Sequence, residues 1–441
     1  MAGNGNSGSD SPSLRKYPSK LFVEVTTRCN LNCVMCVKQN PGHGLTDGDL
    51  PPEFFTALEP ALPNLEALIL NGIGEPLLSL NLDSYVRRAR KLMPKGSWIG
   101  FQTNGLLLTN LRALSLVEAG VDRICISIDA VSPEMFSRVR AGGEVDSIDN
   151  AFKALVRAKE RCGSERLQIG VEFVAMRSNL HELPAAIAWA ARSGASFAIV
   201  THVLPYDEKH ASEIAYSTCS DQALALYERW QGIAMAEGLD LRTYFTARFA
   251  KYTRTQPEQR TVDLVDAMKA EAEAKGITLD LKKLFRIDQS QYEELDEIFA
   301  ETEKIARDAG LDLRLPAVAL KEQRTCSFVE DGAAFVSWNG DISPCYFLWH
   351  RYQCHASGWT QHVQPKVFGN IKRTGILDIW NSDAFKSFRR DVLQYDYPSC
   401  ASCGLAPCDY VDGKEFEQDC HIRNVPCGAC LWCMGVFQCL H

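Results

Sequence analysis

Six short apolar segments alternate with helical segments in the first half of the chain, and this alternation limits the fold more than any other feature. The predicted strands are residues 21–25, 67–70, 98–102, 123–128, 168–174 and 197–200. The predicted helices between them include residues 82–92, 111–119, 149–161 and 183–193. Repeated strand–helix units of this length predict a parallel sheet covered by helices. Six such units favour an α/β fold built as a partial (β/α)6 barrel over a closed barrel of eight strands.

The rest of the chain divides into regions of different composition. Residues 1–18 predict a disordered tail ahead of a barrel domain at 19–206. Residues 207–310 carry long charged amphipathic patterns, which predict a helical insertion that covers the barrel mouth or binds a partner. The chain is then expected to return to the barrel near 311–320. Residues 321–441 are rich in cysteine and predict a small domain organised by metal, with one helical segment predicted over residues 377–392.

Net charge and cysteine content narrow the classes of function. The formal net charge of -8 disfavours nucleic acid and anionic membranes as partners. The sequence contains no apolar run long enough to cross a membrane, and its first residues lack the apolar core of a signal peptide. We therefore expect a cytoplasmic protein. In a reducing compartment, 17 cysteines favour metal ligation over structural disulfides.

Three cysteines directly after the first predicted strand form the strongest motif. Cys29, Cys33 and Cys36 have the spacing CxxxCxxC. They supply three thiolates, one fewer than a closed zinc or iron–sulfur site needs, so a metal centre here would keep a position open for a substrate or cofactor. Their place at the carboxyl end of a strand is where α/β barrels carry their chemistry.

Polar residues follow the next three strands in the same way. They are the run Gly72-Ile73-Gly74-Glu75-Pro76 after the second strand, Asn104 after the third, and Ser127, Arg138 and Arg140 after the fourth. Two glycines allow the backbone to approach a ligand closely, and the Glu75 carboxylate is suited to an ammonium group. Because carboxyl ends of parallel strands share one edge, these groups predict a common ligand site.

Taken together, these motifs resemble the radical S-adenosylmethionine (SAM) enzymes over residues 19–205. Cys29, Cys33 and Cys36 match that family's CxxxCxΦC pattern, with Met35 at the apolar position. The resemblance implies that the three thiolates hold a 4Fe-4S cluster whose open iron binds SAM. It also implies that SAM is contacted by Met35, Gly74, Glu75, Asn104, Ser127 and Arg140, with Arg138 as an alternative to Arg140. The inserted Ile73 departs from the family's Gly-Gly-Glu-Pro element.

The resemblance also implies an activity. Radical SAM enzymes cleave SAM reductively to a 5′-deoxyadenosyl radical, which here would take hydrogen from a peptide, protein or cofactor substrate. A low-potential donor, ferredoxin or flavodoxin, is implied as a partner. The general acid or base is not identified by the sequence: the alternatives are His202, Tyr206, Asp207 and a residue of the helical insertion. Glu172 is predicted either to face the barrel interior or to pair with a basic neighbour.

The cysteine-rich end resembles the SPASM extension, in which cysteines hold one or two auxiliary 4Fe-4S clusters. The predicted metal ligands here are Cys326, Cys345, Cys400, Cys403, Cys408, Cys420, Cys427, Cys430 and Cys433. The resemblance implies one cluster on Cys326, Cys345 and a later residue, with Cys420 as the candidate. It implies a second cluster on Cys400, Cys403 and Cys408 with one ligand from the last group. Zinc sites are the alternative, because CxxC pairs also suit zinc.

Short segments narrow the resemblance further. Three segments, residues 419–439, 202–206 and 368–382, resemble maturases of tungsten-cofactor oxidoreductases. That resemblance implies a cofactor-bearing oxidoreductase as the substrate or partner. A non-catalytic carrier or scaffold for iron–sulfur clusters or metal is the alternative function.

Overall fold

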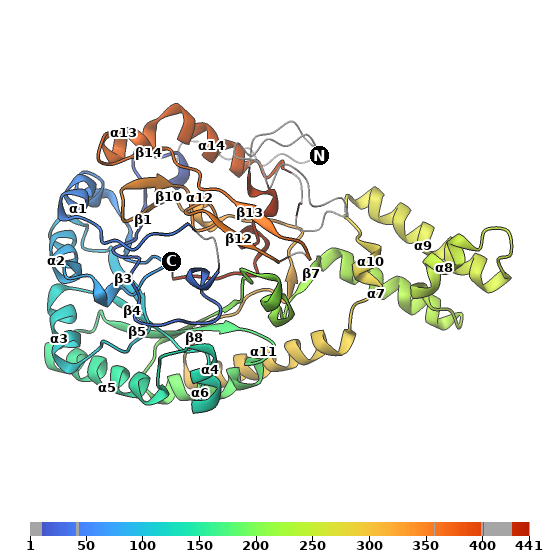
Figure 1. The fold of residues 1–441 in the computed structure, drawn as a ribbon, viewed down its shortest axis with the longest axis horizontal. Helices are drawn as coiled ribbons and strands as arrows, with labels where there is room; N and C mark the ends of the chain where they lie inside the picture. Colours follow the sequence, from blue (N-terminus) through green and yellow to red (C-terminus); the bar gives the residue numbers. More distant parts are fainter. Residues whose placement is uncertain (1–10, 41–43, 357, 398–399, 401–425, 441) are drawn as a thin grey trace.

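The computed structural model describes residues 11–40, 44–356, 358–397, 400 and 426–440, and Figure 1 shows their arrangement. One sheet of ten strands has the order β14-β11-β10-β1-β2-β3-β4-β5-β6-β8. Its strands are β1 Lys20–Val23, β2 Ala67–Ile69, β3 Trp98–Thr103, β4 Arg123–Ser127, β5 Gln168–Ala175, β6 Phe197–His202, β8 Asp312–Arg314, β10 Ala333–Val336, β11 Asp341–Ser343 and β14 Gly369–Asn370. Two smaller sheets pair β7 (Ser217–Ser220) with β9 (Ala319–Leu320) and β12 (Tyr352–Cys354) with β13 (Gln361–Val363).

The sheet is the partial barrel that the sequence predicts. Strands β1 to β6 pair in parallel in chain order and correspond to the six predicted strands. The α-helices are α1 Pro52–Leu58, α2 Leu82–Leu92, α3 Asn110–Ala119, α4 Pro133–Val139, α5 Val145–Cys162, α6 Leu183–Arg192, α7 Asp221–Ala236, α8 Tyr244–Phe249, α9 Gln256–Lys275, α10 Leu281–Leu284, α11 Gln289–Ala309, α12 Ser327–Glu330, α13 Ile376–Asn381 and α14 Asp383–Leu393. Helices α2, α3, α5 and α6 line the outside of the curved sheet (Figure 1). The α/β fold class is thus confirmed.

Helix α11 corrects the predicted extent of the insertion. Residues 207–310 were expected to form one helical insertion, but α11 packs against α6 and so completes the outer layer of the barrel. Strand β8 then pairs with β6, as the predicted return to the barrel requires. Helices α7 to α10 have a hydrophobic core of their own and extend to one side of the barrel (Figure 1). This arm does not lie over the barrel in that view.

Two further expectations differ from the structure. Residues 11–18 were predicted to be part of a disordered tail, but residues 12–14 form a short 3-10 helix and Ser13 is buried. The indole of Trp380 and the guanidinium of Arg389 donate hydrogen bonds to the backbone of this segment. The helical pattern of residues 377–392 is interrupted at Ser382, which ends α13 and caps α14 by accepting a hydrogen bond from the Phe385 amide.

The C-terminal region is continuous with the barrel. Strand β10 pairs in parallel with β1, and one hydrophobic core cluster runs from the barrel into the residues around β10 to β14. The segment of residues 436–438 reaches the end of β6. The backbone amide of His202 donates to the Val436 carbonyl, and the backbone amide of Gln438 donates to the Thr201 hydroxyl. Among the described residues, no helix combines the length and the hydropathy needed to cross a bilayer.

Candidate active site in the barrel

The loop of Cys29, Cys33 and Cys36 leaves β1 at its carboxyl end and is fixed by backbone hydrogen bonds on two sides. The amides of Asn32 and Val34 donate to the carbonyls of Ala141 and Val139, just after α4 and at its end. The Cys36 amide donates to the Cys33 carbonyl at 3.0 Å. All three cysteines line one cavity of about 240 Å³ at this end of the barrel. Burial raises the pKa of the Cys33 thiol to about 11, opposed by the nearby guanidinium of Arg140.

The two glycines of the 72–76 loop are required by contacts inside the protein. A Cβ on Gly74 would lie 2.6 Å from the Arg28 carbonyl oxygen, and a Cβ on Gly72 would lie 2.7 Å from a carboxylate oxygen of Glu24. The Glu75 amide donates to the same Arg28 carbonyl at 2.8 Å. Because neither position has room for a side chain, the loop can lie directly against the segment that leads into Cys29.

The Glu75 carboxylate joins this loop to the end of β3. Its Oε1 accepts from the Thr103 hydroxyl at 2.7 Å and from the Leu77 amide, and its Oε2 accepts from the Asn104 amide at 2.7 Å. These bonds use three of roughly four acceptor positions on a carboxylate. Glu75 is buried and lines the cavity, so one position on Oε2 remains for a ligand.

Arg140 is the basic group of the cavity. Its guanidinium forms a buried ion pair with Asp129 at 2.7 Å and lies 3.9 Å from the Cys33 sulfur. Its Nε is buried and has no hydrogen-bond partner among the residues that the structure describes. Arg138, the alternative from the sequence, instead reaches the Met135 sulfur on the exposed side of α4 and does not line the cavity. The structure brings Met35, Gly74, Glu75, Asn104, Ser127 and Arg140 to the three cysteines.

A second group of cysteines surrounds an enclosed space next to the barrel. Its lining includes Cys326, Cys345, Cys427, Cys430 and Cys433. Burial raises the pKa of the Cys345 thiol to about 12. The Cys433 thiol is turned toward the Cys430 carbonyl, at 3.0 Å. Within the described ranges, no three His, Cys, Asp or Glu side chains converge on one point as ligands of a single metal ion would.

This grouping differs from the one that the sequence implied. The resemblance implied one ligand from the last cysteine group beside Cys400, whereas three residues of that group, Cys427, Cys430 and Cys433, line one space with Cys326 and Cys345. Cys400 is buried but does not line this space. Cys403, Cys408 and Cys420 lie outside the described residues. The chain folds back so that the loop of residues 426–434 contacts the segment before Cys326, through the Thr325 amide and the Cys433 carbonyl at 2.9 Å.

Comparison with known proteins identifies two domains in the chain. Residues 23–183 match the radical SAM superfamily, and residues 326–404 match SPASM, an iron–sulfur cluster-binding domain. The chain thus contains a radical SAM domain and a SPASM domain. A Pyrococcus furiosus protein named tungsten-containing aldehyde ferredoxin oxidoreductase cofactor-modifying protein is 28% identical over 425 residues, covering 95% of this chain and 96% of that protein.

Two further proteins are similar either to a shorter part of this sequence or to its fold alone. A probable GTP 3′,8-cyclase of Methanococcus maripaludis is 28% identical over 191 residues, or 42% of this chain and 59% of the cyclase. SuiB of Streptococcus suis shares the fold with a TM-score of 0.50 at 12% identity, covering 90% of this chain and 74% of that chain.

The radical SAM domain implies a 4Fe-4S cluster and SAM, and the SPASM domain implies auxiliary clusters. The cavity lined by Cys29, Cys33 and Cys36 fits a 4Fe-4S cluster together with SAM. It offers three thiols on one loop, a carboxylate with an open acceptor position and a buried guanidinium nitrogen without a partner among the described residues. SAM carries the complementary amino and carboxylate groups on its methionine part.

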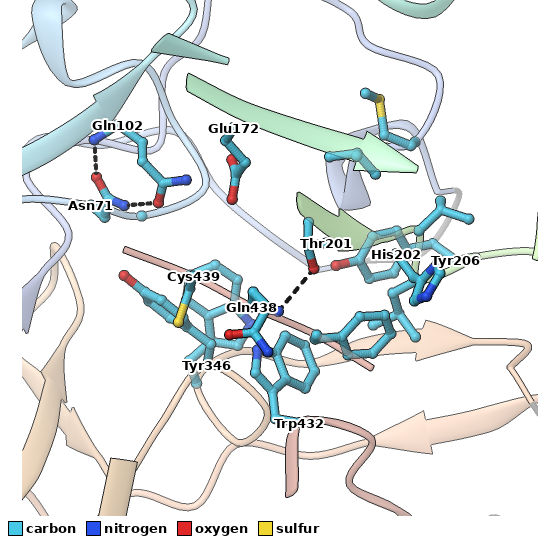
Figure 2. Close-up of a pocket in the computed structure, with 17 residues that line it drawn as sticks. Asn71, Gln102, Glu172, Thr201, His202, Tyr206, Tyr346, Trp432, Gln438 and Cys439 are labelled. Atoms are coloured by element: carbon cyan, nitrogen blue, oxygen red, sulfur yellow. Dashed lines mark hydrogen bonds between the residues drawn. The ribbon is translucent and has the colours of Figure 1, made fainter. Parts of the chain in front are cut away.

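A second cavity of about 270 Å³ adjoins the first one, which is called the SAM cavity below because its residues fit SAM. The sequence did not predict that the residues of the second cavity come together. Met35, Asn71, Gly72, Gln102, Glu172 and Val174 line both cavities. Figure 2 shows the Glu172 carboxyl group pointing into the second cavity, with Asn71 and Gln102 on one side and Thr201 on the other. Burial raises the pKa of Glu172 to about 7, opposed by a hydrogen bond from the Gln102 side chain. Glu172 therefore faces the barrel interior, one of the two alternatives from the sequence.

The register of β5 and β6 places the Glu172 side chain and the His202 side chain on opposite faces of the sheet, although His202 is also among the residues that line the cavity. Glu172 pairs with Ile199, and Val174 pairs with Thr201, so these residues share the inner face of the sheet. His202 is one position further along and therefore faces outward. Its ring packs against Tyr216 and Phe299, and its Nε2 lies 3.1 Å from the Ala317 carbonyl. Burial lowers the pKa of His202 to about 4, so the imidazole is neutral at physiological pH.

Replacing Gly74 with alanine tests whether the tight approach of the two loops matters for SAM cleavage. The new Cβ would meet the Arg28 carbonyl and displace the Cys29 loop or the 72–76 loop. We expect Gly74→Ala to lower the rate of 5′-deoxyadenosine formation by roughly 100-fold, since misplacement by about 1 Å has that effect in active sites. The assay uses anaerobically reconstituted protein with dithionite as reductant.

The matched control is Gly96→Ala, because no atom lies within 4 Å of a Cβ at that position. Gly96→Ala should retain the wild-type rate. A Gly74→Ala protein with wild-type rate would show that the close packing at Gly74 is unimportant for the reaction.

Proposed function

We propose that this radical SAM enzyme modifies the cofactor of an oxidoreductase, in the manner that the name of the Pyrococcus furiosus protein describes. The similarity to that protein extends over nearly all of both chains. The observation that carries the proposal is the continuity of the two cavities, which share six residues. A molecule in the second cavity would lie directly beside the place where the 5′-deoxyadenosyl radical forms.

In this proposal Cys29, Cys33 and Cys36 hold the catalytic 4Fe-4S cluster and leave one iron for SAM. When bound, the cluster supplies the electron that cleaves SAM to methionine and the 5′-deoxyadenosyl radical. The remaining position on Glu75 Oε2 accepts a hydrogen bond from the methionine amino group. Arg140 binds the methionine carboxylate, and its ion pair with Asp129 fixes the plane of the guanidinium. Met35, Gly74, Asn104 and Ser127 form the rest of the wall around SAM.

We also propose ligands for one auxiliary cluster, namely Cys326, Cys345, Cys427 and Cys430. These four line one enclosed space, and the Cys433 thiol beside them is turned toward backbone. Cys400, Cys403, Cys408 and Cys420 stay as predicted ligands of a second auxiliary cluster. Trp432 lines both this space and the second cavity, so the auxiliary cluster would lie close to the substrate. The electron donor we propose is a ferredoxin or flavodoxin in the cytoplasm.

Arg140→Lys tests the assignment of the carboxylate-binding group. Lysine keeps a positive charge next to Asp129 but lacks the planar fork that pairs with a carboxylate. We expect SAM affinity to fall by roughly tenfold to 100-fold, the loss of one hydrogen bond to a charged group. Equilibrium dialysis of SAM against reconstituted protein measures the effect.

Arg138→Lys provides the comparison, because Arg138 carries the same charge two residues earlier and lies outside the SAM cavity. It should bind SAM as the wild type does. If the two variants bound SAM with equal affinity, Arg140 would not be the group that binds the SAM carboxylate.

Cys430→Ala tests the auxiliary site. The variant should lose about four iron atoms per chain after anaerobic reconstitution, because a 4Fe-4S cluster needs its full set of thiolates. The control is Cys354→Ala. Cys354 is also buried, but its thiol donates to the Gln361 side chain at 3.5 Å and does not line the auxiliary space. Zinc in place of iron at the native site, or unchanged iron in Cys430→Ala, would contradict the assignment.

Deuterium transfer tests the proposed reaction even though the substrate is unidentified. Cells that naturally contain this enzyme are grown in D₂O, and their whole extract is added to reconstituted enzyme with SAM and dithionite. Hydrogen abstraction from a deuterated substrate would place deuterium in 5′-deoxyadenosine, which mass spectrometry detects. A carrier or scaffold protein would form no 5′-deoxyadenosine. Formation of only unlabelled 5′-deoxyadenosine would exclude a substrate in the extract.

A further inference from the structure

Glu172 occupies the junction of the SAM cavity and the second cavity, and it belongs to neither the cluster ligands nor the groups that bind the methionine part of SAM. It projects from the inner face of β5, and β4 separates that strand from Gln102 on β3. The register places Ser127 of the SAM cavity directly beside it. A group at this junction can contact a substrate on one side while SAM lies on the other.

A chain of amide groups fixes the orientation of Glu172. The Asn71 side-chain amide donates to the Gln102 Oε1, and the Gln102 backbone amide donates to the Asn71 Oδ1 at 2.6 Å. With its oxygen occupied in this way, the Gln102 side chain is left with its NH₂ group to offer to Glu172, whose pKa it lowers. Two dashed lines in Figure 2 mark the Asn71–Gln102 bonds. Gln102 thus holds the carboxyl group in position from one side and leaves the cavity side open.

Among the described residues, no basic side chain pairs directly with Glu172. The charged groups near it offset one another. Asp129 raises and Arg140 lowers the pKa of Glu172, and these two residues are already paired with each other. The other titratable groups that face Glu172 are Cys125, Tyr346 and Cys439. Burial raises the pKa of each of these three, so they are neutral at physiological pH. The carboxylate is therefore free to accept a hydrogen bond from a ligand.

The opposite walls of the second cavity are mostly aromatic and come from the C-terminal region. They include Tyr346, Trp349, Trp432 and Phe437, with the side chain of Gln438 among them. Hydrogen bonds of residues 436 and 438 to β6 hold this C-terminal segment inside the barrel. The volume of about 270 Å³ is near the lower end of the roughly 300–1,000 Å³ typical of small-molecule sites. Flat apolar walls and a polar edge suit a planar ring that carries N–H or O–H groups.

We propose that Glu172 anchors the substrate by accepting a hydrogen bond from an N–H or O–H group on a small planar ring, held between the aromatic walls and the SAM cavity. The inference rests on the proposed function and adds the class of substrate: a free small molecule bearing a hydrogen-bond donor, in contrast to a segment of polypeptide. Gln102 and Asn71 are positioning residues, because they act through the Glu172 carboxylate.

The test separates the deuterated extract into a fraction below about 3 kDa and a protein fraction, the former being the size class that a cavity of this volume admits. Wild-type enzyme should transfer deuterium from the small-molecule fraction. The readout is the deuterated share of all 5′-deoxyadenosine, which corrects for the amount of active protein. Glu172→Gln keeps the size of the side chain but removes its charge, so this share should fall by about tenfold or more, the loss of a hydrogen bond to a charged acceptor. Glu172→Asp restores a carboxylate and should give an intermediate share.

The pH dependence distinguishes this role from a merely structural one. With a pKa raised to about 7, Glu172 is protonated below that pH and becomes an acceptor above it. The deuterated share should therefore rise through about pH 7 in the wild type and stay flat in Glu172→Gln. The control Glu165→Gln removes an exposed glutamate just before β5 and should behave as the wild type.

The outcomes separate this inference from the proposed function. Deuterium transfer from the protein fraction alone would overturn the small-molecule assignment and leave the maturase proposal intact. Transfer from neither fraction would overturn the proposed function itself. Transfer from the small-molecule fraction that is unchanged in Glu172→Gln would overturn the role of Glu172.

Discussion

The buried carboxylate of Glu24 joins the three parts on which the active site depends. It lies at the end of β1, the strand that pairs with β2 on one side and with β10 of the SPASM region on the other. One oxygen accepts from the Ile73 amide at 3.1 Å, the other from the Trp338 amide at 3.3 Å, and both lie near the His350 ring. The cysteine loop, the 72–76 loop and the C-terminal domain are thereby tied to one strand end. A buried carboxyl group is tolerated here because both of its oxygens have hydrogen-bond partners.

The same strand end explains how two cysteine groups far apart in sequence come to lie on either side of the second cavity, which shares residues with the cavity of the first group and Trp432 with the space of the second. Strand β1 leads directly into Cys29, and β10 leads through β11 to Cys345. The chain then returns through residues 426–440, which bring Cys427 and Cys430 to the auxiliary space and Trp432 to the wall between that space and the second cavity. The partial barrel leaves its interior open, and the protein fills part of it with its own C-terminal segment. The second cavity is thus bounded by residues of both domains.

The SAM cavity was predictable because its residues follow strands in a fixed order. Cys29, Glu75, Asn104 and Ser127 each come at or after the end of an apolar run, and parallel strands place such residues at one edge. Periodicity also located α2, α3 and α6 closely, although it began α5 too late and merged α13 with α14 across Ser382. The grouping of the auxiliary cysteines was not predictable, because their spacing is compatible with several partitions. Only the return of the C-terminal loop against Thr325 placed Cys427 and Cys430 beside Cys326.

The sequence by itself determined the order of the barrel strands, the three-thiol loop and the set of polar groups around SAM, because each depends on local pattern and on the shared edge of a parallel sheet. Tertiary structure alone decided which face of β6 each side chain takes, so that Thr201 shares the face of Glu172 while the His202 ring packs against Tyr216 and Phe299. It also decided that α11 belongs to the barrel, because its apolar face packs on α6. The closure of the second cavity beside Glu172 depends on contacts between segments as far apart in sequence as Thr201 and Gln438. No local pattern records such contacts, because their energy comes from burial and hydrogen bonds that exist only in the folded chain.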